Sequence, residues 1–178
     1  MRILIIYFSF SGNNRRLAEY LAKEIQCDIC PIIEKKRRTM LTIVLDMIFK
    51  RSPKIEAIET PISNYDHTIL VAPIWDSKIA NPLKTLIKRK KNSLNNYSFI
   101  SFCGFDRPGQ KERITNQLTD LTGYPPKAVS ELKVCELFPS EYRDEVNTIS
   151  RYHITSKDLF KFEDKIYDFL HLIQRTKY

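Results

Sequence analysis

The chain has 178 residues, the length of one domain, and its 29 basic side chains outnumber 21 acidic ones to give a net charge of +8. Folding at this length buries roughly 70% of the chain's surface, so a real hydrophobic core is available. Four cysteines are too few for a disulfide scaffold. The longest apolar stretch, Leu41 to Phe49, is far shorter than the ~20 residues of a membrane span. The apolar start at Ile3 to Ile6 is too short for a secretory signal. We therefore expect a cytoplasmic protein with one domain over residues 1–178 and no transmembrane segment.

Strand and helix patterns alternate along the chain. An apolar strand at residues 2–8 precedes a helix at 13–25, in which Leu17, Leu21 and Ile25 fall on one face. The elements expected after these are a strand at 27–33, a helix at 39–50, a strand at 67–72, a helix at 82–92, a strand at 97–102, a helix at 110–122, a strand at 129–137 and a helix at 156–174. Such alternation is typical of an α/β protein with a parallel sheet covered by helices on both faces.

Capping residues mark the ends of several of these helices. Asn81 followed by Pro82 predicts an N-cap with proline at the first helical position. Gly123 is expected to end the helix at 110–122. Thr155 and Asp158 have the spacing of a capping box at the start of the last helix.

The loop between the first strand and the first helix has the features of a phosphate-binding loop. The first N–H groups of a helix lack internal partners and carry partial positive charge, so they attract anions. Gly12 permits a tight turn and a close backbone approach, and Asn13 or Asn14 suits the helix N-cap. Further donors come from the hydroxyls and amides of Ser9, Ser11, Asn13 and Asn14. The loop therefore predicts a phosphate site built from neutral donors.

Two other kinds of phosphate loop do not fit this segment. A Walker loop has Lys and then Ser or Thr after its last glycine, whereas Gly12 is followed by Asn13 and Asn14. The dinucleotide fingerprint has three spaced glycines, and this loop has one. The phosphate of a mononucleotide fits better. Taken alone, the loop is equally consistent with an ordinary polar turn that caps a helix.

Three segments taken together resemble the flavodoxin family. The first, Ser9-Phe10-Ser11-Gly12-Asn13-Asn14, is similar to the family's phosphate loop of hydroxyl-x-hydroxyl-Gly-Asn-Thr, with Asn14 in place of Thr. The second is a strand, Thr68 to Ala72, that ends in Pro73-Ile74-Trp75, like the family's second flavin loop. The third is a strand, Tyr97 to Phe102, that runs into Cys103-Gly104-Phe105-Asp106, where the family's third loop borders the isoalloxazine ring.

The resemblance implies a three-layer, doubly wound α/β fold with five parallel strands in the order 2-1-3-4-5, and FMN as the cofactor. The first segment would hold the phosphate and the other two would border the ring, with Trp75 stacked on the flavin. The cofactor-binding residues that it implies are Ser9, Ser11, Gly12, Asn13, Asn14, Pro73, Ile74, Trp75, Asp76, Cys103, Gly104, Phe105 and Asp106. Asp76 stands where the family often has glycine or a second aromatic residue, and a carboxylate close to the ring would lower its reduction potential.

Two activities are implied for an FMN protein of this kind. A carrier exchanges electrons with a redox partner protein, whereas an oxidoreductase such as an NAD(P)H:quinone reductase exchanges them with NAD(P)H and a small-molecule acceptor. The sequence contains no recognisable nicotinamide-binding motif and does not choose between them. The alternative from another class is a flavodoxin-fold binding module without flavin, which would act through protein or anionic-surface interactions.

Basic residues cluster in two runs, Lys35 to Arg38 and Lys88 to Lys91. Electrostatic steering by such runs favours an acidic partner surface, although a solvated face that needs no partner is the preferred account of each run. Nucleic-acid binding is not expected, because charge alone supports it and no recognition motif accompanies the charge. Arg15 and Arg16, in the first turn of the first helix, are likewise interpreted as solvated surface residues.

Cysteines and histidines predict neither a redox centre nor a metal site. Cys27 and Cys30 have redox-motif spacing, but on a strand two residues three apart point to opposite faces, so a structural role is preferred. His67, His153 and His171 are scattered, without acidic or cysteine companions at metal-ligand spacing. No catalytic side chain is predicted, and the chemistry is expected to belong to the cofactor.

The segment from Leu137 to Thr155 is less regular than the rest of the chain. Because it follows the last strand, it is expected to leave the sheet at its carboxyl edge. The hypothesis is that Phe138 or Tyr142 limits access to the flavin edge or shapes a substrate site.

Overall fold

A five-stranded parallel sheet forms the centre of the molecule, in the computed structural model that describes residues 1–35 and 52–174. Its strands are β1 (Ile3–Tyr7), β2 (Asp28–Pro31), β3 (His67–Val71), β6 (Tyr97–Cys103) and β7 (Val129–Lys133). They lie side by side in the order β2-β1-β3-β6-β7, and every neighbouring pair is parallel. Counted along the chain, this is the order 2-1-3-4-5, so the predicted topology is confirmed.

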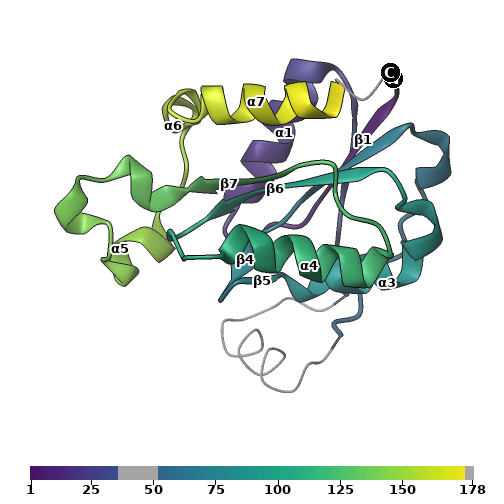
Figure 1. Ribbon diagram of the computed structural model, residues 1–178, viewed down its shortest axis with the longest axis horizontal. Helices are drawn as coiled ribbons and strands as arrows, with labels where there is room; N and C mark the ends of the chain where they lie inside the picture. The colour runs from purple at the N-terminus through teal and green to yellow at the C-terminus, as the bar shows by residue number, and fades with distance from the viewer. Residues whose placement is uncertain (36–51, 175–178) are drawn as a thin grey trace.

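Helices cover both faces of the sheet and produce three layers (Figure 1). On one face lie α1 (Asn13–Ile25) and α7 (Glu163–Gln174), and on the other lie α3 (Asn81–Lys90) and α4 (Gln110–Thr122). The shorter elements are η1 (Ile62–Asn64), η2 (Lys91–Ser93), η3 (Val134–Leu137), η4 (Ser140–Tyr142), α5 (Val146–Arg151), α6 (Ser156–Phe160) and a hairpin of β4 (Ile74–Trp75) and β5 (Lys78–Ile79).

The central strands are apolar on both sides because each side has its own core. In β1, Ile3 and Ile5 pack in the core beneath α1 and α7, whereas Leu4 and Ile6 pack in the core beneath α3 and α4. This follows from the alternation of side chains along a strand. A strand covered on both faces is a continuous apolar run, and that is the pattern that made β1, β3 and β6 predictable from the sequence.

Several predicted boundaries are wrong. The strand expected at 129–137 ends at Lys133, because Lys133 pairs with Cys103, the last residue of β6. Within the described residues no other strand pairs beyond that point, and η3 follows instead. The strand expected at 27–33 is limited to Asp28–Pro31. The last helix is divided into α6 and α7, and between them the ring of Phe162 turns into the core, 5.4 Å from the ring of Phe102.

Two predicted N-caps are also wrong, each by one or two residues. α1 is capped by Gly12 in the left-handed conformation, and Asn13 and Asn14 are its first helical residues. α3 is capped by Ala80, and Asn81 is already helical. Thr155 and Asp158 do form the expected capping box, at the start of α6. The helix expected at 39–50 lies outside the described residues.

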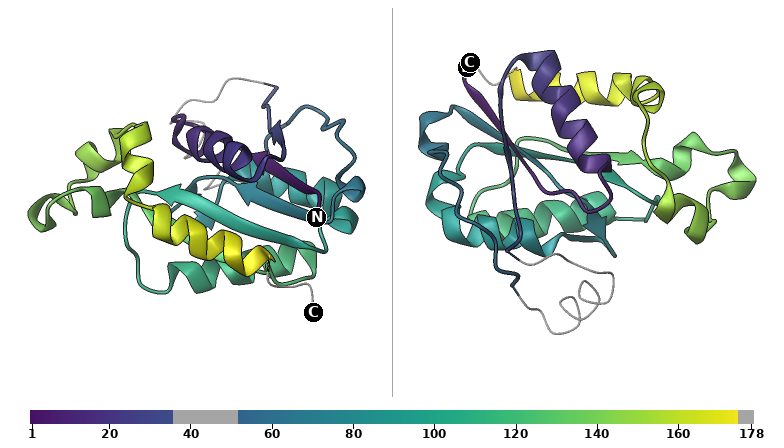
Figure 2. Two further views of the ribbon diagram at one scale, coloured as in Figure 1. Left: turned by 90° about the horizontal axis from the view of Figure 1, so that it is seen from above. Right: turned by 180° about the vertical axis from the view of Figure 1, so that it is seen from behind.

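The carboxyl ends of the strands open onto an edge that carries most of the irregular structure. The β4–β5 hairpin and the segment with η3, η4 and α5 lie there, and the α5 segment projects beyond the end of the sheet in every view (Figure 2). Among the helices of residues 1–35 and 52–174, none combines the length and the apolar character needed to span a membrane.

Candidate functional site

Three loops meet at the carboxyl edge, where β1, β3 and β6 end side by side. The first loop contacts the second through Phe10, whose ring centre is 6.3 Å from that of Trp75 in an edge-to-face arrangement. The second contacts the third through the ion pair of Asp76 with Arg107, at 3.0 Å. The first contacts the end of β6 through Asn14, which hydrogen-bonds the backbone of Phe102. The three sequence segments that resemble a flavin site are therefore joined at one edge.

The first loop leaves the beginning of α1 open to an anion. Gly12 has φ +95°, and its N–H donates to Ser9 Oγ at 3.1 Å, so the loop folds back on itself just before the helix. In the described part of the chain, no side chain caps the first turn, and the N–H groups of Asn13, Asn14 and Arg15 have no internal acceptor. These N–H groups and the helix dipole form an anion-binding position next to the exposed Ser11.

The side chains of Asn13 and Asn14 make structural contacts that the sequence did not indicate. Asn14 is 4% exposed; its Nδ2 donates to the carbonyl of Phe102 at 3.1 Å and its Oδ1 accepts from the N–H of Phe102 at 2.9 Å. Asn13 makes the same kind of pair with the segment before α6, donating to Tyr152 O at 2.8 Å and accepting from Ile154 N–H at 2.9 Å. The two amides thus fix the first loop to its neighbours, and the donors that remain for an anion are the backbone N–H groups and the hydroxyls of Ser9 and Ser11.

The second loop is a tight hairpin in which Trp75 is half-buried. Pro73 precedes β4, and the carbonyl of Pro73 accepts from the N–H of Ala80 at 3.2 Å, which closes the hairpin. The Trp75 ring packs edge-on against Phe8 and Phe10, at centre distances of 6.1 and 6.3 Å. Trp75 is therefore part of an aromatic group at the junction of the first and second loops, with one part of its ring still exposed.

The turn of this hairpin consists of Asp76 and Ser77, and both have positive φ, +48° and +55°. Asp76 is exposed and its carboxylate pairs with Arg107. Ser77 points the other way and is buried against α4. The arginine that neutralises Asp76 was not singled out in the sequence, because only the tertiary structure places it opposite the carboxylate.

The third loop begins with a buried cysteine. Burial raises the pKa of the Cys103 thiol to about 12, so it stays protonated and unreactive at neutral pH. The carbonyl of Gly104 accepts from the N–H of Cys135 at 2.9 Å, Phe105 packs against the core beneath α1 and α7, and Asp106 pairs with Lys133 at 2.6 Å. The loop is fixed to the end of β7.

A fourth segment, residues 134–155, lies beside these loops. Phe138 packs edge-to-face on Tyr152, with ring centres 5.1 Å apart, and Tyr152 in turn holds Asn13 through its carbonyl. Tyr142 is 47% exposed. Phe138 is therefore engaged in packing, while Tyr142 is accessible; the hypothesis that either residue limits access to a bound flavin stays a prediction.

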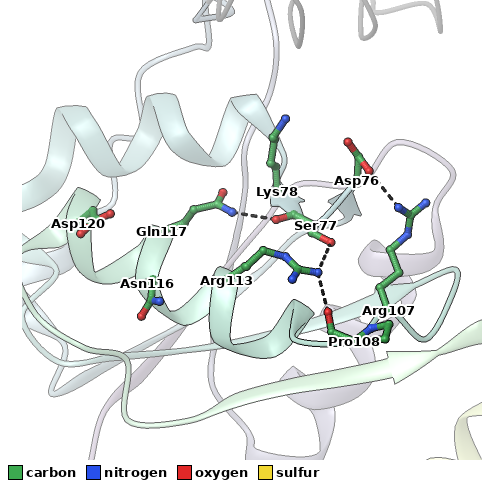
Figure 3. Close-up of a pocket in the computed structure, with 9 residues that line it drawn as sticks. All are labelled: Asp76, Ser77, Lys78, Arg107, Pro108, Arg113, Asn116, Gln117 and Asp120. Carbon is green, nitrogen blue, oxygen red and sulfur yellow. Dashed lines mark hydrogen bonds and ion pairs between the residues drawn. The ribbon is translucent and has the colours of Figure 1, made fainter.

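A surface depression of about 640 Å³ lies between the β4–β5 hairpin and α4 (Figure 3). It is lined by Asp76, Ser77, Lys78, Arg107, Pro108, Arg113, Asn116, Gln117 and Asp120. No residue of the first loop lines it, so it is distinct from the anion-binding position at α1. It shares Asp76 with the second loop and Arg107 with the third.

The cysteines and histidines are scattered: Cys103 and Cys135 are buried near this edge, His153 is exposed in the fourth segment, and the others lie elsewhere. Cys27 and Cys30 pack against opposite faces of the sheet, as predicted, and both are free thiols. Burial raises the pKa of the Cys27 thiol to about 11. Over residues 1–35 and 52–174, no cluster of His, Cys, Asp and Glu has the arrangement of a metal site.

Comparisons with known proteins find likeness in structure and none in sequence. No model of a known protein family matches the chain, and neither does any curated protein sequence. A flavoprotein from Lactobacillus acidophilus NCFM, crystallised in complex with FMN, superposes with a TM-score of 0.63 and 20% identity over 83% of this chain and 99% of its own. Flavodoxin 1 from Bacillus cereus gives 0.52 and 14% over 96% and 98%, and a flavodoxin from the domain Archaea gives 0.53 and 13% over 98% and 100%.

These structures define the class of fold. The chain has the flavodoxin-like α/β fold, with five parallel strands in the same topology and three loops gathered at the carboxyl edge of the sheet. Alignment over nearly the whole length of the flavodoxins means that the described chain includes all the layers of that fold. At identities of 13–20%, the likeness concerns the fold, and function has to be argued from the site.

Proposed function

We propose that this chain is a single-domain, cytoplasmic FMN protein that transfers electrons or catalyses flavin-dependent oxidoreduction. The observation that carries the proposal is the open first turn of α1, preceded by the left-handed Gly12 and placed beside a half-exposed tryptophan from the neighbouring strand. A phosphate and an aromatic ring are the two parts of a flavin mononucleotide that such a pair of features recognises. The FMN complex among the structural neighbours supports the same reading.

The residues present fit the group. Ser9, Ser11 and Gly12, with the backbone N–H groups of Asn13 and Asn14, would hold the phosphate. Trp75 and the rest of the second loop would border one side of the ring and Cys103 to Asp106 the other. The flavin would supply reversible acceptance of one or two electrons.

Arg107 partly neutralises the negative charge of Asp76, which would lie near the edge of the flavin ring. Asp76 was expected to lower the reduction potential of a nearby flavin. Its carboxylate pairs with Arg107 at 3.0 Å, so we expect the effect of Asp76 to be weakened by the neighbouring positive charge. Removal of Arg107 by Arg107→Ala is the change that would expose the full charge of Asp76.

Titration of the purified protein with FMN tests the proposal. We expect quenching of flavin fluorescence, a yellow complex and about a tenfold loss of affinity in Trp75→Ala, because stacking adds ~0.5–1.5 kcal/mol beyond burial of the ring. The matched control is Tyr167→Ala, an exposed aromatic on α7 that belongs to none of the three loops. Unchanged FMN affinity in Trp75→Ala would show that stacking on Trp75 does not contribute to binding. A protein that does not bind FMN at all would contradict the proposal.

The redox partner is proposed in general terms, as a partner protein or a small-molecule acceptor, with NAD(P)H as a candidate donor. Net charge was expected to favour an acidic partner. However, Lys88 to Lys91 lie at the end of α3, which starts at the hairpin and runs back toward the amino edge of the sheet, away from the proposed site. Anaerobic reduction separates the two activities: a long-lived semiquinone indicates a carrier, and rapid NAD(P)H-driven quinone turnover indicates an enzyme.

A further inference from the structure

The turn that follows Trp75 has a backbone conformation that its own residues disfavour. Asp76 and Ser77 both have positive φ, as the two central residues of a type I′ hairpin turn require. Such turns favour Asn-Gly or Asp-Gly, because glycine alone adopts positive φ without cost to a Cβ atom. Serine at the second position therefore needs support from outside the turn.

That support comes from one face of α4. Arg113 Nη2 donates to Ser77 Oγ at 3.1 Å, and Ser77 Oγ donates to Gln110 Oε1 at 3.4 Å. Gln117 Nε2 donates to the carbonyl of Ser77 at 2.8 Å, and Gln117 Oε1 accepts from the N–H of Ile79 at 3.4 Å. Positions 110, 113 and 117 are three and four residues apart, so they share a helix face, and Figure 3 shows the side chains of Arg113 and Gln117 reaching toward Ser77.

The same helix face also reaches the third loop. Gln110 is 4% exposed, and its Nε2 lies 3.8 Å from the sulfur of Cys103 and 3.0 Å from Glu131 Oε1. Arg113 donates a second bond to the carbonyl of Pro108, at 2.9 Å. Contacts from one helix thus fix the strained turn of the second loop relative to the third loop.

We propose that Gln110, Arg113 and Gln117 form a clamp that holds the Asp76–Ser77 turn in its disfavoured conformation and thereby positions Trp75 for the flavin. The inference rests on the proposed function. The three residues touch neither Trp75 nor the first loop in the described contacts, so their role is that of positioning residues. Without the clamp, the turn relaxes to negative φ, and the direction in which β4 presents Trp75 changes.

Gln117→Ala is the cleanest test, because among the described residues the amide of Gln117 hydrogen-bonds only the backbone of the hairpin. We expect FMN binding to weaken by about tenfold, which is the equivalent of about 1.4 kcal/mol. The control is Asn116→Ala, at the neighbouring position of the helix: Asn116 is exposed, lines the same depression, and its side chain makes no hydrogen bond within the described residues. Its affinity should stay within about twofold of the wild-type value. Gln117→Met, which keeps the length of the side chain and removes the amide, should repeat the loss if Gln117→Ala folds poorly.

Relief of the strain should remove the need for the clamp. Ser77→Gly leaves an Asp-Gly turn, which favours type I′ by itself, and the backbone groups that Gln117 contacts are still present. In the Ser77→Gly background, we expect Gln117→Ala to weaken FMN binding by less than about threefold. An undiminished tenfold loss in that background would show that Gln117 acts through general stability, and would overturn the inference.

Trp75 provides a second readout that does not depend on FMN. It is the single tryptophan of the chain, so its fluorescence reports the hairpin alone. We expect iodide to quench Trp75 more strongly in Gln117→Ala than in Asn116→Ala, and the difference to shrink in the Ser77→Gly background. Equal quenching in the two single variants would overturn the clamp. A wild-type protein that binds no FMN would contradict the proposed function. The quenching comparison would still show whether Gln117 holds the hairpin turn in place.

Discussion

The two edges of the sheet are built from the same strands and differ in how their polar groups are satisfied. At the amino edge, the N–H of Arg2 donates to Asp66 at 2.6 Å, both ring nitrogens of His67 have partners in Asn96 and Ser98, and the hydroxyl of Tyr97 bonds Thr122. Positive φ also occurs there, but at Gln26 and Gly123, which end helices and use the conformation to bond the preceding turn.

At the carboxyl edge, the polar groups and the strain are left available for a ligand. The first N–H groups of α1 have no acceptor among the described residues, Phe10 is 42% exposed, and Asp76 and Ser77 keep positive φ only with help from α4. Strained backbone and unsatisfied donors cost free energy, so they concentrate where binding compensates for them. The comparison supports the proposal that the carboxyl edge binds a ligand, whereas the polar groups of the amino edge satisfy one another.

The largest expected effect is that of Asn14→Ala, which should lower the free energy of unfolding by about 2–4 kcal/mol. Removal of the amide breaks two hydrogen bonds and leaves the buried N–H of Phe102 without a partner among the described residues, while its C=O keeps the bond from Ser101 Oγ. Urea denaturation of the flavin-free protein measures the change, with Arg16→Ala, an exposed residue of the same helical turn, as the control. Equal midpoints for the two variants would refute this account of Asn14.

A matched pair of glycines separates stability from binding. Gly12→Ala and Gly123→Ala each place a Cβ at positive φ, +95° and +88°, without a clash closer than 3.7 Å. Each should therefore lower stability by about 1–2 kcal/mol through backbone strain alone. Only Gly12→Ala should also weaken FMN binding, because Gly123 lies at the amino edge. Comparable losses of FMN affinity in both variants would break the distinction between the edges.

The buried His67, at the amino edge, predicts that the folding stability depends on pH. Burial lowers the pKa of His67, although the hydrogen bond to Asn96 acts in the opposite direction. The unfolded chain, with a pKa near ~6.5, then binds a proton before the folded protein does, so stability falls as the pH drops below that value, by at most about 1.4 kcal/mol per pH unit. His67→Gln should remove this part of the slope between pH 7.5 and 5.5 in urea unfolding (about two units around the unfolded pKa) and leave FMN affinity unchanged. Superimposable slopes would contradict the prediction.

The smallest effect is expected from Arg15→Gln. The N–O distance of the Arg15–Glu19 pair is 2.7 Å, but its side chains are 64% and 51% exposed, and solvent screening leaves such exposed i, i+4 pairs with little effect on stability. If the helix N–H groups provide the attraction for phosphate, FMN affinity should change by less than about twofold. A tenfold loss would show that the site depends on a cation after all.

The strands and most helices could be predicted because their signals are local and repeated. The continuous apolar runs of β1, β3 and β6 follow from burial on both faces, and the alternation with helices leads to the observed strand order. The end of β7 could not be predicted, because it depends on where β6 stops pairing. The apolar residues Val134, Cys135 and Leu137 continue beyond that point. Likewise, Phe162 divides the last helix because its ring packs on Phe102, a contact across 60 positions of sequence.

By itself, the sequence determined which loops lie together at one edge of the sheet: hydroxyls and Gly12 before a helix, and an aromatic residue after a neighbouring strand, are local features that any parallel sheet brings to the same edge. The tertiary structure decided what the polar side chains do there. Asn14 looks like a phosphate donor from its place in the loop, yet its amide is taken by the backbone of Phe102, 88 positions away. Gln110, Arg113 and Gln117 belong to no motif in the sequence, and only the tertiary structure places them against the turn at Ser77. A hydrogen bond between distant segments depends on distances that no local pattern contains. The fold could therefore be predicted from the sequence, whereas the contacts that fix the loops could not.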